Sequence, residues 1–548
     1  MSKTKSPITR RSFLKTTMAA AAGAAAVPLS SNAATRYFIP PTQTPRYKRY
    51  NVTSPQGQAA LTSYAVGITE MMSLPPSDPL NWFRNAFTHM MDCPHGNWWF
   101  YVWHRGYLGY FEQTIRKLSG DSNFALPYWD WTTLPEIPAS MFQGVLNPND
   151  SVYEPTTRNL DVFTSKLRQP LEAYWATLSQ AQRDQLNLRG YTSFDLMWND
   201  VTGYSPSCEC GVAVNICFAP TCSARFLTSN NRQLDERTQV DVSASTICSG
   251  LAPTEFINSD QVLSFNSRKT ASHMVAPNGS FSVLEGMPHN KVHNNIGGIG
   301  HIDPGPYGVM ANFLSPLDPI FFLHHGNMDR LWDVWTRKQQ RLGLPITPAD
   351  PTERNQFMQE PFLFFVDANG QSKSHIAGEF FFMNSFDYDY EPGFGEECTA
   401  AQKVSKARTQ VKGVVKANTA ALTVPADAIR QHLAAPAAAS LFAEVTVPHP
   451  SGESSTREFD VLINAPADVT RVGADSPYYA GTIAFFGNMA GHAHGTNASA
   501  TFVVPLPKSA QAFQSSGAAA NASVNIRIVP ANGRGKTPVL KAATIKSL

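Results

Sequence analysis

The sequence predicts a mainly α-helical protein with a four-helix bundle at its core, a long loop-rich insertion in the helical part, and a C-terminal antiparallel β-sandwich. Two groups of three histidines lie on or beside segments with helical hydrophobic periodicity, which is typical of a site built between bundle helices. From about residue 440 the pattern changes to short alternating runs separated by turn residues, which indicates antiparallel strands.

Length and composition limit the class of protein. The chain has 548 residues, of which 43% are hydrophobic and 16% charged, so it is globular and long enough for more than one domain. The net charge of +2 provides no basic surface for a nucleic acid, and nucleic acid is therefore excluded as a partner. The predicted parts are a signal peptide at 1–34, a helical domain at 35–397 with the insertion at about 132–280, a linker at 398–439, and the β-sandwich at 440–548.

The N-terminus carries an export signal. Residues 9–15 read TRRSFLK, a twin-arginine signature, and a short alanine-rich apolar run and small residues near a cleavage site follow it. The apolar run is too short to anchor the chain in a membrane, and no later segment reaches the length of a membrane span. We therefore expect export by the twin-arginine route to the periplasm or beyond.

The first histidine group lies between residues 78 and 120. Residues 35–78 are rich in Pro and Thr, and we expect an extended arm there. Asp78 and Pro79 then predict the start of a helix, DPLNWFRNAFTHMM, which carries His89.

The other two histidines of this group follow a loop. Pro94 and Gly96 place His95 in that loop, because nine residues on one continuous helix would put His95 and His104 on opposite sides. His104 lies on the next helix, which is predicted to end at Gly120.

The second histidine group lies between residues 285 and 335. His289 and His293 are four residues apart, so on a helix both imidazoles lie on one face and can share a metal. His325 begins a second helical run, FFLHHGNMDRLWDVW, and supplies a third imidazole. Imidazole suits copper, zinc and iron alike, and a helix pair with buried, hydrogen-bonded histidines is the alternative for this segment alone. Two such groups together predict a dinuclear site between the helices.

The segments HGNWWFYVWHRGYLGYFE and DPIFFLHHGNMDRLW resemble the type-3 copper proteins, which comprise tyrosinases and other polyphenol oxidases, catechol oxidases and haemocyanins, over roughly residues 79–395. The resemblance implies a dicopper centre in a tyrosinase-like catalytic domain at 35–397. It gives the first copper the ligands His89, His95 and His104, and the second His289, His293 and His325. In the family the ligand stands four residues before the aspartate, here Asp329, which favours His325 over His324. His273 and His301 are the alternatives to His89.

The resemblance also implies roles around the two metals. Cys93 can form a thioether with His95, and Glu285 with Asn290 can hold a water that deprotonates a phenol. A gate residue thirteen positions before His325 would be Asn312. The residues expected to orient the ligands from behind are Arg105, His324, Asp329 and Arg330.

The implied function is phenol oxidation with O2 as co-substrate. A tyrosinase hydroxylates monophenols to o-diphenols and oxidises these to o-quinones, and the first of these reactions is the one that needs Glu285 and Asn290. The alternatives are a catechol oxidase or o-aminophenol oxidase without monophenolase activity, a haemocyanin-like oxygen carrier, and a mononuclear zinc hydrolase that would leave one histidine group unexplained. The expected partners are small phenols and a copper metallochaperone, and the sequence does not define the oligomeric state.

The C-terminal part resembles domains that cover the active site in latent plant and fungal enzymes, and a permanent stabilising domain is the alternative. In an exported chain, disulfides are favoured over metal binding for Cys208, Cys210, Cys217 and Cys222. Cys248 and Cys398 can form a further pair. The pair His492 and His494 is more consistent with incidental histidines than with copper loading.

Overall fold

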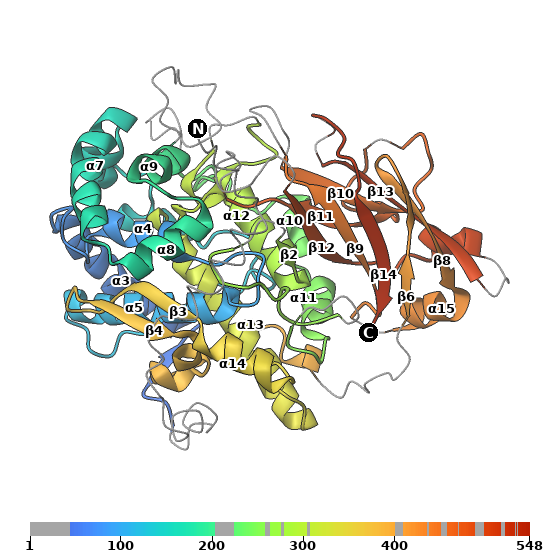
Figure 1. Ribbon diagram of the computed structural model, residues 1–548, viewed down its shortest axis with the longest axis horizontal. Coiled ribbons are helices and arrows are strands. Elements are labelled where there is room, and N and C mark those ends of the chain that lie inside the picture. Colours follow the sequence, from blue (N-terminus) through green and yellow to red (C-terminus); the bar gives the residue numbers. More distant parts are fainter. Residues whose placement is uncertain are drawn as a thin grey trace, which may run out of the picture. The chain divides into compact units, whose positions relative to one another are not determined.

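Four helices carry the predicted histidines or lead directly into them (Figure 1). They are α4 (Trp82–Asp92), α5 (Phe100–Ser119), α12 (Asn290–Gly297) and α13 (Ile320–Leu342). Helix α5 packs against α13, and the loop that holds His95 joins α4 to α5. The predicted helical core is confirmed.

The computed structural model describes residues 44–202, 224–257, 263–275, 279–303, 307–399, 409–435, 438–450, 457–469, 471–487, 498–516, 521–531, 533 and 535–548. From Pro45 onward the chain forms one unit, in which the helical part and the β-sandwich are in direct contact. No helix in the described part of the chain combines the length and hydrophobicity that crossing a bilayer requires.

The extended arm predicted at 35–78 is wrong for its second half, because residues Pro55–Ser73 form helix α3, which packs against α5. The Ser54 side chain accepts a hydrogen bond from the Gly57 N–H and Pro55 occupies the first turn, so the helix start is well capped. The helix buries Leu61, Tyr64 and Ile68 on one face.

Helix α4 starts three residues later than the Asp78 cap predicts. The side chain of Asn81 accepts from the N–H groups of Phe83 and Arg84 and is the true N-cap. Asp78 instead accepts from the Leu80 N–H in the preceding turn. Helix α5 ends at Gly120 as predicted, and Gly120 adopts a left-handed φ of 73°.

The predicted insertion contains several helices joined by loops. Its helices of eight residues or more are α7 (Leu160–Thr177), α8 (Gln180–Arg189), α9 (Phe194–Thr202) and α11 (Ala244–Leu251). The short α6 (Glu154–Thr157) precedes α7, and the short α10 (Glu236–Asp241) lies between α9 and α11. A π-helical turn, η4 (Glu285–His289), leads into α12. Helix α14 (Pro351–Gln359) and the two-stranded sheets β1–β5 (Tyr47–Arg49, Tyr388–Tyr390) and β3–β4 (Pro361–Val366, Ser372–Ile376) complete the helical part.

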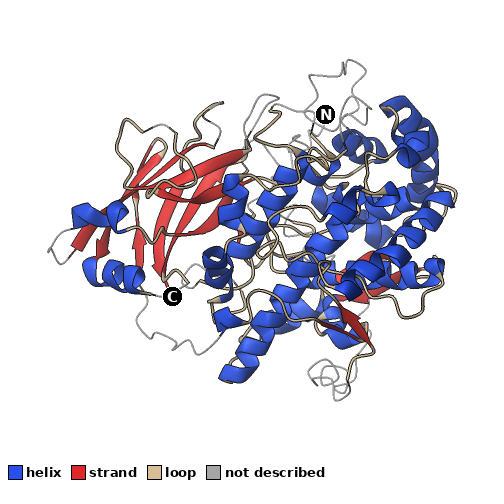
Figure 2. Cartoon of the chain, turned by 180° about the vertical axis from the view of Figure 1, so that it is seen from behind, coloured by secondary structure: helices blue, strands red, loops and turns tan. Residues whose placement is uncertain are grey.

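Two five-stranded sheets form the C-terminal sandwich and share one hydrophobic cluster (Figure 2). The first has the order β11-β10-β13-β8-β7 and the second β2-β12-β9-β14-β6. The strands are β2 (Ser280–Phe281), β6 (Gln410–Lys412), β7 (Val414–Lys416), β8 (Thr419–Pro425), β9 (Leu441–Pro448), β10 (Glu458–Ile463), β11 (Tyr479–Ala484), β12 (Ser499–Pro505), β13 (Asn521–Pro530) and β14 (Ala542–Ser547), with helix α15 (Ala426–Ala434) after β8.

The segment predicted as a linker at 398–439 contributes strands to the C-terminal sandwich. Strand β8 pairs with β13 along its whole length, and β6 pairs with β14, so these residues belong to the two sheets. The burial of β8 alternates, with Ala420, Leu422 and Val424 facing the core. The sandwich therefore begins before residue 440, and the boundary of an independently folding domain stays a prediction.

The sandwich is joined to the helical part through backbone pairing and close packing. Strand β2, which precedes the second histidine group, pairs in parallel with β12. At Gly481 of β11 an added Cβ would lie 2.4 Å from the end of the flexible Met287 side chain, so β11 and η4 pack closely there, and the φ of 157° favours glycine. The disulfide between Cys248 and Cys398, predicted from the sequence, is present.

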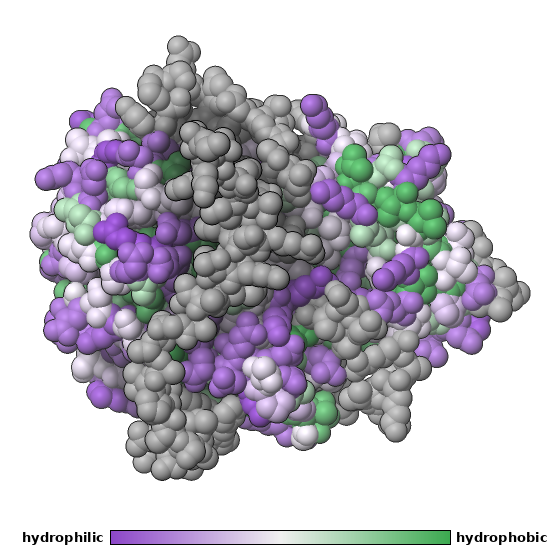
Figure 3. Space-filling model, viewed as in Figure 1, coloured by the Kyte–Doolittle hydropathy of each residue, from purple (hydrophilic) through white to green (hydrophobic). Residues whose placement is uncertain are grey.

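Figure 3 shows hydrophobic residues gathered over the β-rich part on one face, whereas the helical part on that face is mainly hydrophilic. Among the described residues, Val414 of β7 and Val539 are the large hydrophobic side chains most open to solvent, at 78% and 60% exposed.

Candidate metal centre

The first histidine group is fully assembled from α4, the following loop and α5. His89, His95 and His104 each offer a ring nitrogen within 4.8 Å of the other two, and all three residues are counted in one candidate metal group. The Nε2 atoms of His89 and His104 are 3.4 Å apart. The structure thus brings together the three residues that the family resemblance assigned to the first copper.

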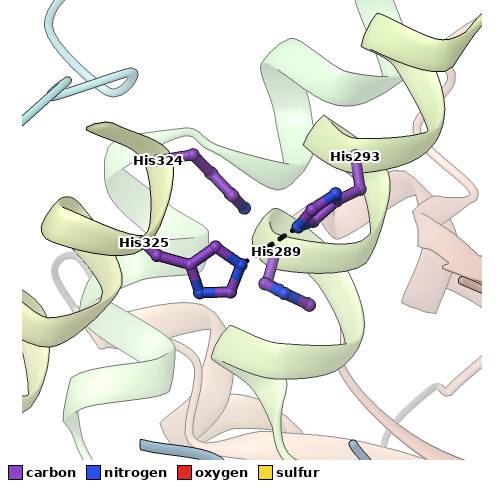
Figure 4. A group of neighbouring side chains, drawn as sticks. All are labelled: His289, His293, His324 and His325. Carbon is purple, nitrogen blue, oxygen red and sulfur yellow. Dashed lines mark hydrogen bonds between the residues drawn. The ribbon is translucent and has the colours of Figure 1, made fainter. Parts of the chain in front are cut away.

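The second group comes from η4, α12 and α13. Figure 4 shows His324 and His325 extending from one helix towards His289 and His293, whose side chains come from the neighbouring helix. One ring nitrogen of each of the four lies within 4.8 Å of the others, and the Nε2 atoms of His293 and His325 are 3.2 Å apart.

The two groups are adjacent. The rings of His104 and His325 stack with centroids 4.3 Å apart, and those of His95 and His289 are 5.6 Å apart. Metal ions bound in the two groups would therefore be neighbours, as the dinuclear prediction requires.

The tautomers of the rings leave lone pairs facing one another. Nδ1 donates to a main-chain carbonyl in His89 (Phe313, 2.8 Å), His104 (Phe100, 2.7 Å) and His293 (Met310, 2.7 Å). A neutral imidazole that donates from Nδ1 has only a lone pair on Nε2. Two such lone pairs 3.4 Å apart repel each other unless a cation lies between them, so the arrangement fits a metal.

Burial keeps these imidazoles neutral. It lowers the pKa of His89 and of His289 to about 3, and it lowers the pKa of His95, His104, His293 and His325 well below the usual value. Nε2 of His95, Nε2 of His289 and Nδ1 of His325 are buried with no hydrogen-bond partner among the described residues. Buried unpaired nitrogens are costly, and coordination of a metal would satisfy those that face the site.

His324 differs from the other imidazoles of the second group. Its Nδ1 accepts a hydrogen bond from the indole Nε1–H of Trp131 at 3.0 Å. Trp131 belongs to the segment PYWDW at residues 127–131, and its contact with His324 was not predicted from the sequence.

Glu285 and Asn290 are both buried beside the second group, but the described structure gives them separate partners. Glu285 accepts from the Gly96 N–H at 2.6 Å and from the Ser267 hydroxyl. Burial raises the pKa of Glu285 to about 8, against the opposing effect of these two donors. Asn290 accepts from His289 Nδ1 at 2.8 Å and donates to the Ala484 carbonyl of β11 at 2.9 Å.

The predicted role of Arg105, Asp329 and Arg330 in orienting the ligands stays a prediction, and the structure shows which partners these buried side chains have. Asp329 accepts from Arg105 at 2.7 Å and from the hydroxyls of Tyr388 and Tyr390. Arg330 donates to Asn327 and to the Phe394 carbonyl. These buried groups join α5 and α13 to residues 387–395 (DYDYEPGFG). The sequence could not show these contacts, because the paired residues are more than fifty positions apart.

Cys93 is a free, buried thiol with Sγ 3.5 Å from Nδ1 of His95. This approach is consistent with the predicted thioether, which stays a prediction. The guanidinium of Arg189 donates to the Cys93 carbonyl and holds the same loop.

Of the two alternative ligands, His301 is 35% exposed on its side chain and pairs with Asn295 and Asp235. His273 lies between two carboxylates, with Nε2 3.0 Å from Asp92 and Nδ1 2.6 Å from Glu360. Both imidazoles therefore have polar partners away from the two groups.

His273 provides a test of stability against pH. Despite the opposing effect of burial, Asp92 and Glu360 raise its pKa to about 9, from 6.5. The stabilisation is therefore fully present below pH 6.5 and is lost as pH rises through about 9. Replacing His273 by glutamine should cost about 3 kcal/mol at pH 6 and much less at pH 10, as measured by urea unfolding. An equal cost at both values would contradict the ion-pair account.

Two aromatic residues that the sequence analysis missed lie over the site. The ring of Phe313 stacks on His95 with centroids 5.5 Å apart, whereas the neighbouring Asn312, predicted as the gate, accepts from the Leu314 N–H. Phe486, in the segment after β11, lies 4.3 Å from the His293 ring and 5.0 Å from the His95 ring. The sandwich thus places an aromatic ring against both histidine groups.

Several sequence predictions fall outside the described residues. These are the signal peptide at 1–34, the cysteines Cys208, Cys210, Cys217 and Cys222, and the pair His492 and His494.

Comparison with known proteins agrees with the metal centre. Residues 78–338 match the family model described as the common central domain of tyrosinase, and residues 7–28 match the twin-arginine translocation signal sequence. The predicted twin-arginine signal is confirmed.

Curated relatives include enzymes from a bacterium and a plant. Tyrosinase HcTyr1 of Hahella sp. (strain CCB-MM4) is 25% identical over 393 residues, 65% of this chain and 66% of that protein. The chloroplastic polyphenol oxidase of Spinacia oleracea is 24% identical over 367 residues, 63% of this chain and 46% of that protein. The chain thus spans between about half and two thirds of these relatives.

Among solved structures, a latent aurone synthase (polyphenol oxidase) has a TM-score of 0.54 at 18% identity, covering 93% of this chain and 90% of that one. At this identity the similarity establishes the fold.

Proposed function

The chain is a type-3 copper protein of the tyrosinase family, and from this premise we propose that it is an exported phenol oxidase that hydroxylates monophenols and oxidises o-diphenols to o-quinones. The observation that carries the proposal is the adjacency of two buried imidazole groups, with His104 and His325 stacked at 4.3 Å. An oxidation of a diphenol removes two electrons, which a pair of adjacent copper ions can accept together.

The proposed ligands are His89, His95 and His104 for the first copper and His289, His293 and His325 for the second. Bound copper would supply the redox chemistry with O2. The chain itself contributes neutral rings of fixed tautomer, the aromatic rings of Phe313 and Phe486 packed against the histidines, and groups that accept a proton.

Glu285 is the proposed proton acceptor for monophenols. A phenol must lose its proton before its oxygen can bind a metal, and a buried carboxylate with a raised pKa is a stronger base than an exposed one. Water held between Glu285 and the amide of Asn290 would carry the proton.

Replacing Glu285 by glutamine should therefore separate the two reactions. We expect monophenol turnover to fall about 100-fold, while oxidation of the matching o-diphenol changes by no more than a few-fold. Initial rates with both substrates on the same copper-loaded preparation provide the measurement. A parallel fall in both rates would mean that Glu285 supports the centre as a whole and does not act as the base.

An o-diphenol oxidase without monophenolase activity is the second candidate. The observation that favours it is that both oxygens of Glu285 accept hydrogen bonds and that the Asn290 amide donates to Ala484. With these groups engaged, a water between Glu285 and Asn290 would require the sandwich to move.

We further propose that the sandwich shields the centre. Lys291 of α12 pairs with Glu458 of β10 at 2.7 Å, and Arg237 of α10 binds Asp460 at 3.0 Å. These two ion pairs, of which the one between Lys291 and Glu458 is fully buried, hold the strand next to the segment that bears Phe486. Shielding predicts a latent full-length enzyme that becomes active when this segment is displaced.

Oxygen uptake by copper-loaded protein tests the proposed function, with Phe486→Ala to remove the ring that packs against the histidines and with a monophenol and its o-diphenol as substrates. Uptake with both substrates supports a tyrosinase, and uptake with the diphenol alone supports a catechol oxidase. Binding of O2 without turnover of either phenol would leave an oxygen carrier and contradict the enzyme.

A further inference from the structure

The PYWDW segment runs beside the start of α13. The Trp129 N–H donates to the Leu323 carbonyl at 3.0 Å, and the Trp129 indole donates to the Leu134 carbonyl at 3.0 Å. Trp131 is completely buried, and its indole is directed at His324, the residue before the proposed ligand His325. The segment therefore contacts the second histidine group through one side chain.

The contact between Trp131 and His324 determines where the proton of His324 lies. An indole nitrogen can only donate a hydrogen bond, so Nδ1 of His324 must accept. A ring whose Nδ1 accepts a hydrogen bond is neutral, because a protonated imidazole carries N–H on both nitrogens. A neutral ring whose Nδ1 accepts carries its single proton on Nε2.

This tautomer is the opposite of that of the neighbouring ligand. His293 donates from Nδ1 to the Met310 carbonyl and keeps its lone pair on Nε2. His324, in contrast, carries its N–H on Nε2. Among the described residues this N–H has no hydrogen-bond partner of good geometry, although the His289 carbonyl lies beside the ring. Metal ligation needs a lone pair, and His324 has committed its only one to Trp131.

His324 is nevertheless close enough to bind. One of its ring nitrogens lies within 4.8 Å of nitrogens of His289, His293 and His325. With four imidazoles available to the second metal, distance alone does not limit the ligand set to three. A fourth ligand would occupy the position that an oxidase must keep open for its substrate.

We propose that Trp131 is a positioning residue of the second copper site, which holds His324 in the non-ligating tautomer and so restricts the site to His289, His293 and His325. This inference rests on the proposed dicopper function. Without the indole donor, His324 can move its proton to Nδ1 and offer Nε2 to the metal. The loss of one neutral hydrogen bond is enough to change such a preference by about tenfold.

The test compares Trp131→Phe with Trp129→Phe. Both variants remove a buried indole N–H from the same segment, but only the first N–H goes to an imidazole. We expect Trp131→Phe to release its second copper to a chelator about tenfold more slowly than the wild type, and to take up less oxygen with an o-diphenol. Trp129→Phe should release copper at the wild-type rate.

Two further variants separate a ligand effect from a packing effect. In the double variant Trp131→Phe with His324→Leu, copper release should return to the wild-type rate, because the competing imidazole is gone. The single variant His324→Leu should keep the wild-type copper-to-protein ratio. Cobalt(II) substituted for copper gives a second readout, since its visible absorption weakens when a further ligand is added.

Three results would overturn the inference. They are equal copper release rates for Trp131→Phe and Trp129→Phe, copper release from the double variant that stays slower than from the wild type, and loss of one copper from His324→Leu. If the wild type holds two coppers, none of these results contradicts the proposed function. A wild type that binds fewer than two coppers would instead contradict the proposed function itself.

Discussion

Replacement of His293 by glutamine should leave about one copper per chain and reduce oxygen uptake with an o-diphenol by about a thousand-fold or more. His293 is fully buried, its Nδ1 is fixed by the Met310 carbonyl, and its Nε2 lies 3.2 Å from Nε2 of His325. The amide of glutamine can accept a hydrogen bond but is a poor ligand for copper. Elemental analysis and an oxygen electrode on the same preparation give both values.

The matched control for this prediction is His301→Gln, a change of the same size in the same region of the chain. His301 pairs with Asn295 and Asp235 and is partly exposed. This variant should keep both coppers and its oxygen uptake. If His293→Gln also kept both coppers, the second ligand set would be wrong.

Replacement of Phe486 by alanine should raise o-diphenol turnover by the full-length protein about 10- to 100-fold. The ring lies 4.3 to 5.6 Å from the rings of His293, His95 and His289. Burying a phenylalanine side chain contributes about 1.5–3 kcal/mol, and its removal shifts the population towards an open site by the corresponding factor. Steady-state rates on intact protein measure the effect.

Phe486→Tyr is the control, because it keeps an aromatic ring of the same shape over the histidines. It should remain as latent as the wild type. If Phe486→Ala were no more active than the wild type and limited proteolysis of the sandwich still activated the enzyme, another part of the sandwich would be responsible for shielding.

The helices that carry the histidines were predictable because their signals are local. The four-residue spacing of His289 and His293, and the glycine after α5, act within one or two helical turns. Helix α3 was equally local but was missed, because the Pro- and Thr-rich composition around it obscured the Ser54-Pro55 start signal. The strands before residue 440 were missed for a similar reason. The alternation of buried and exposed residues in β8 is present, but the alanine-rich composition of the segment obscures it.

The residues that shape the site from a distance could not be predicted from the sequence. Phe486 meets His293 across almost two hundred residues, and Trp131 meets His324 across a similar separation. No periodicity or spacing in the sequence predicts such contacts, because they depend on how the β-sandwich and the helices pack against one another. The same holds for β2, whose two residues extend the sandwich from within the helical part.

The most direct test of the account is the copper-to-protein ratio of the exported, copper-loaded protein after removal of loosely bound metal. We expect about two copper ions per chain, because two buried imidazole groups lie side by side and each contains three proposed ligands. We expect no zinc, because a site of nitrogen ligands binds copper(II) more tightly than zinc. A single metal ion per chain, or zinc bound in preference to copper, would contradict the dicopper centre.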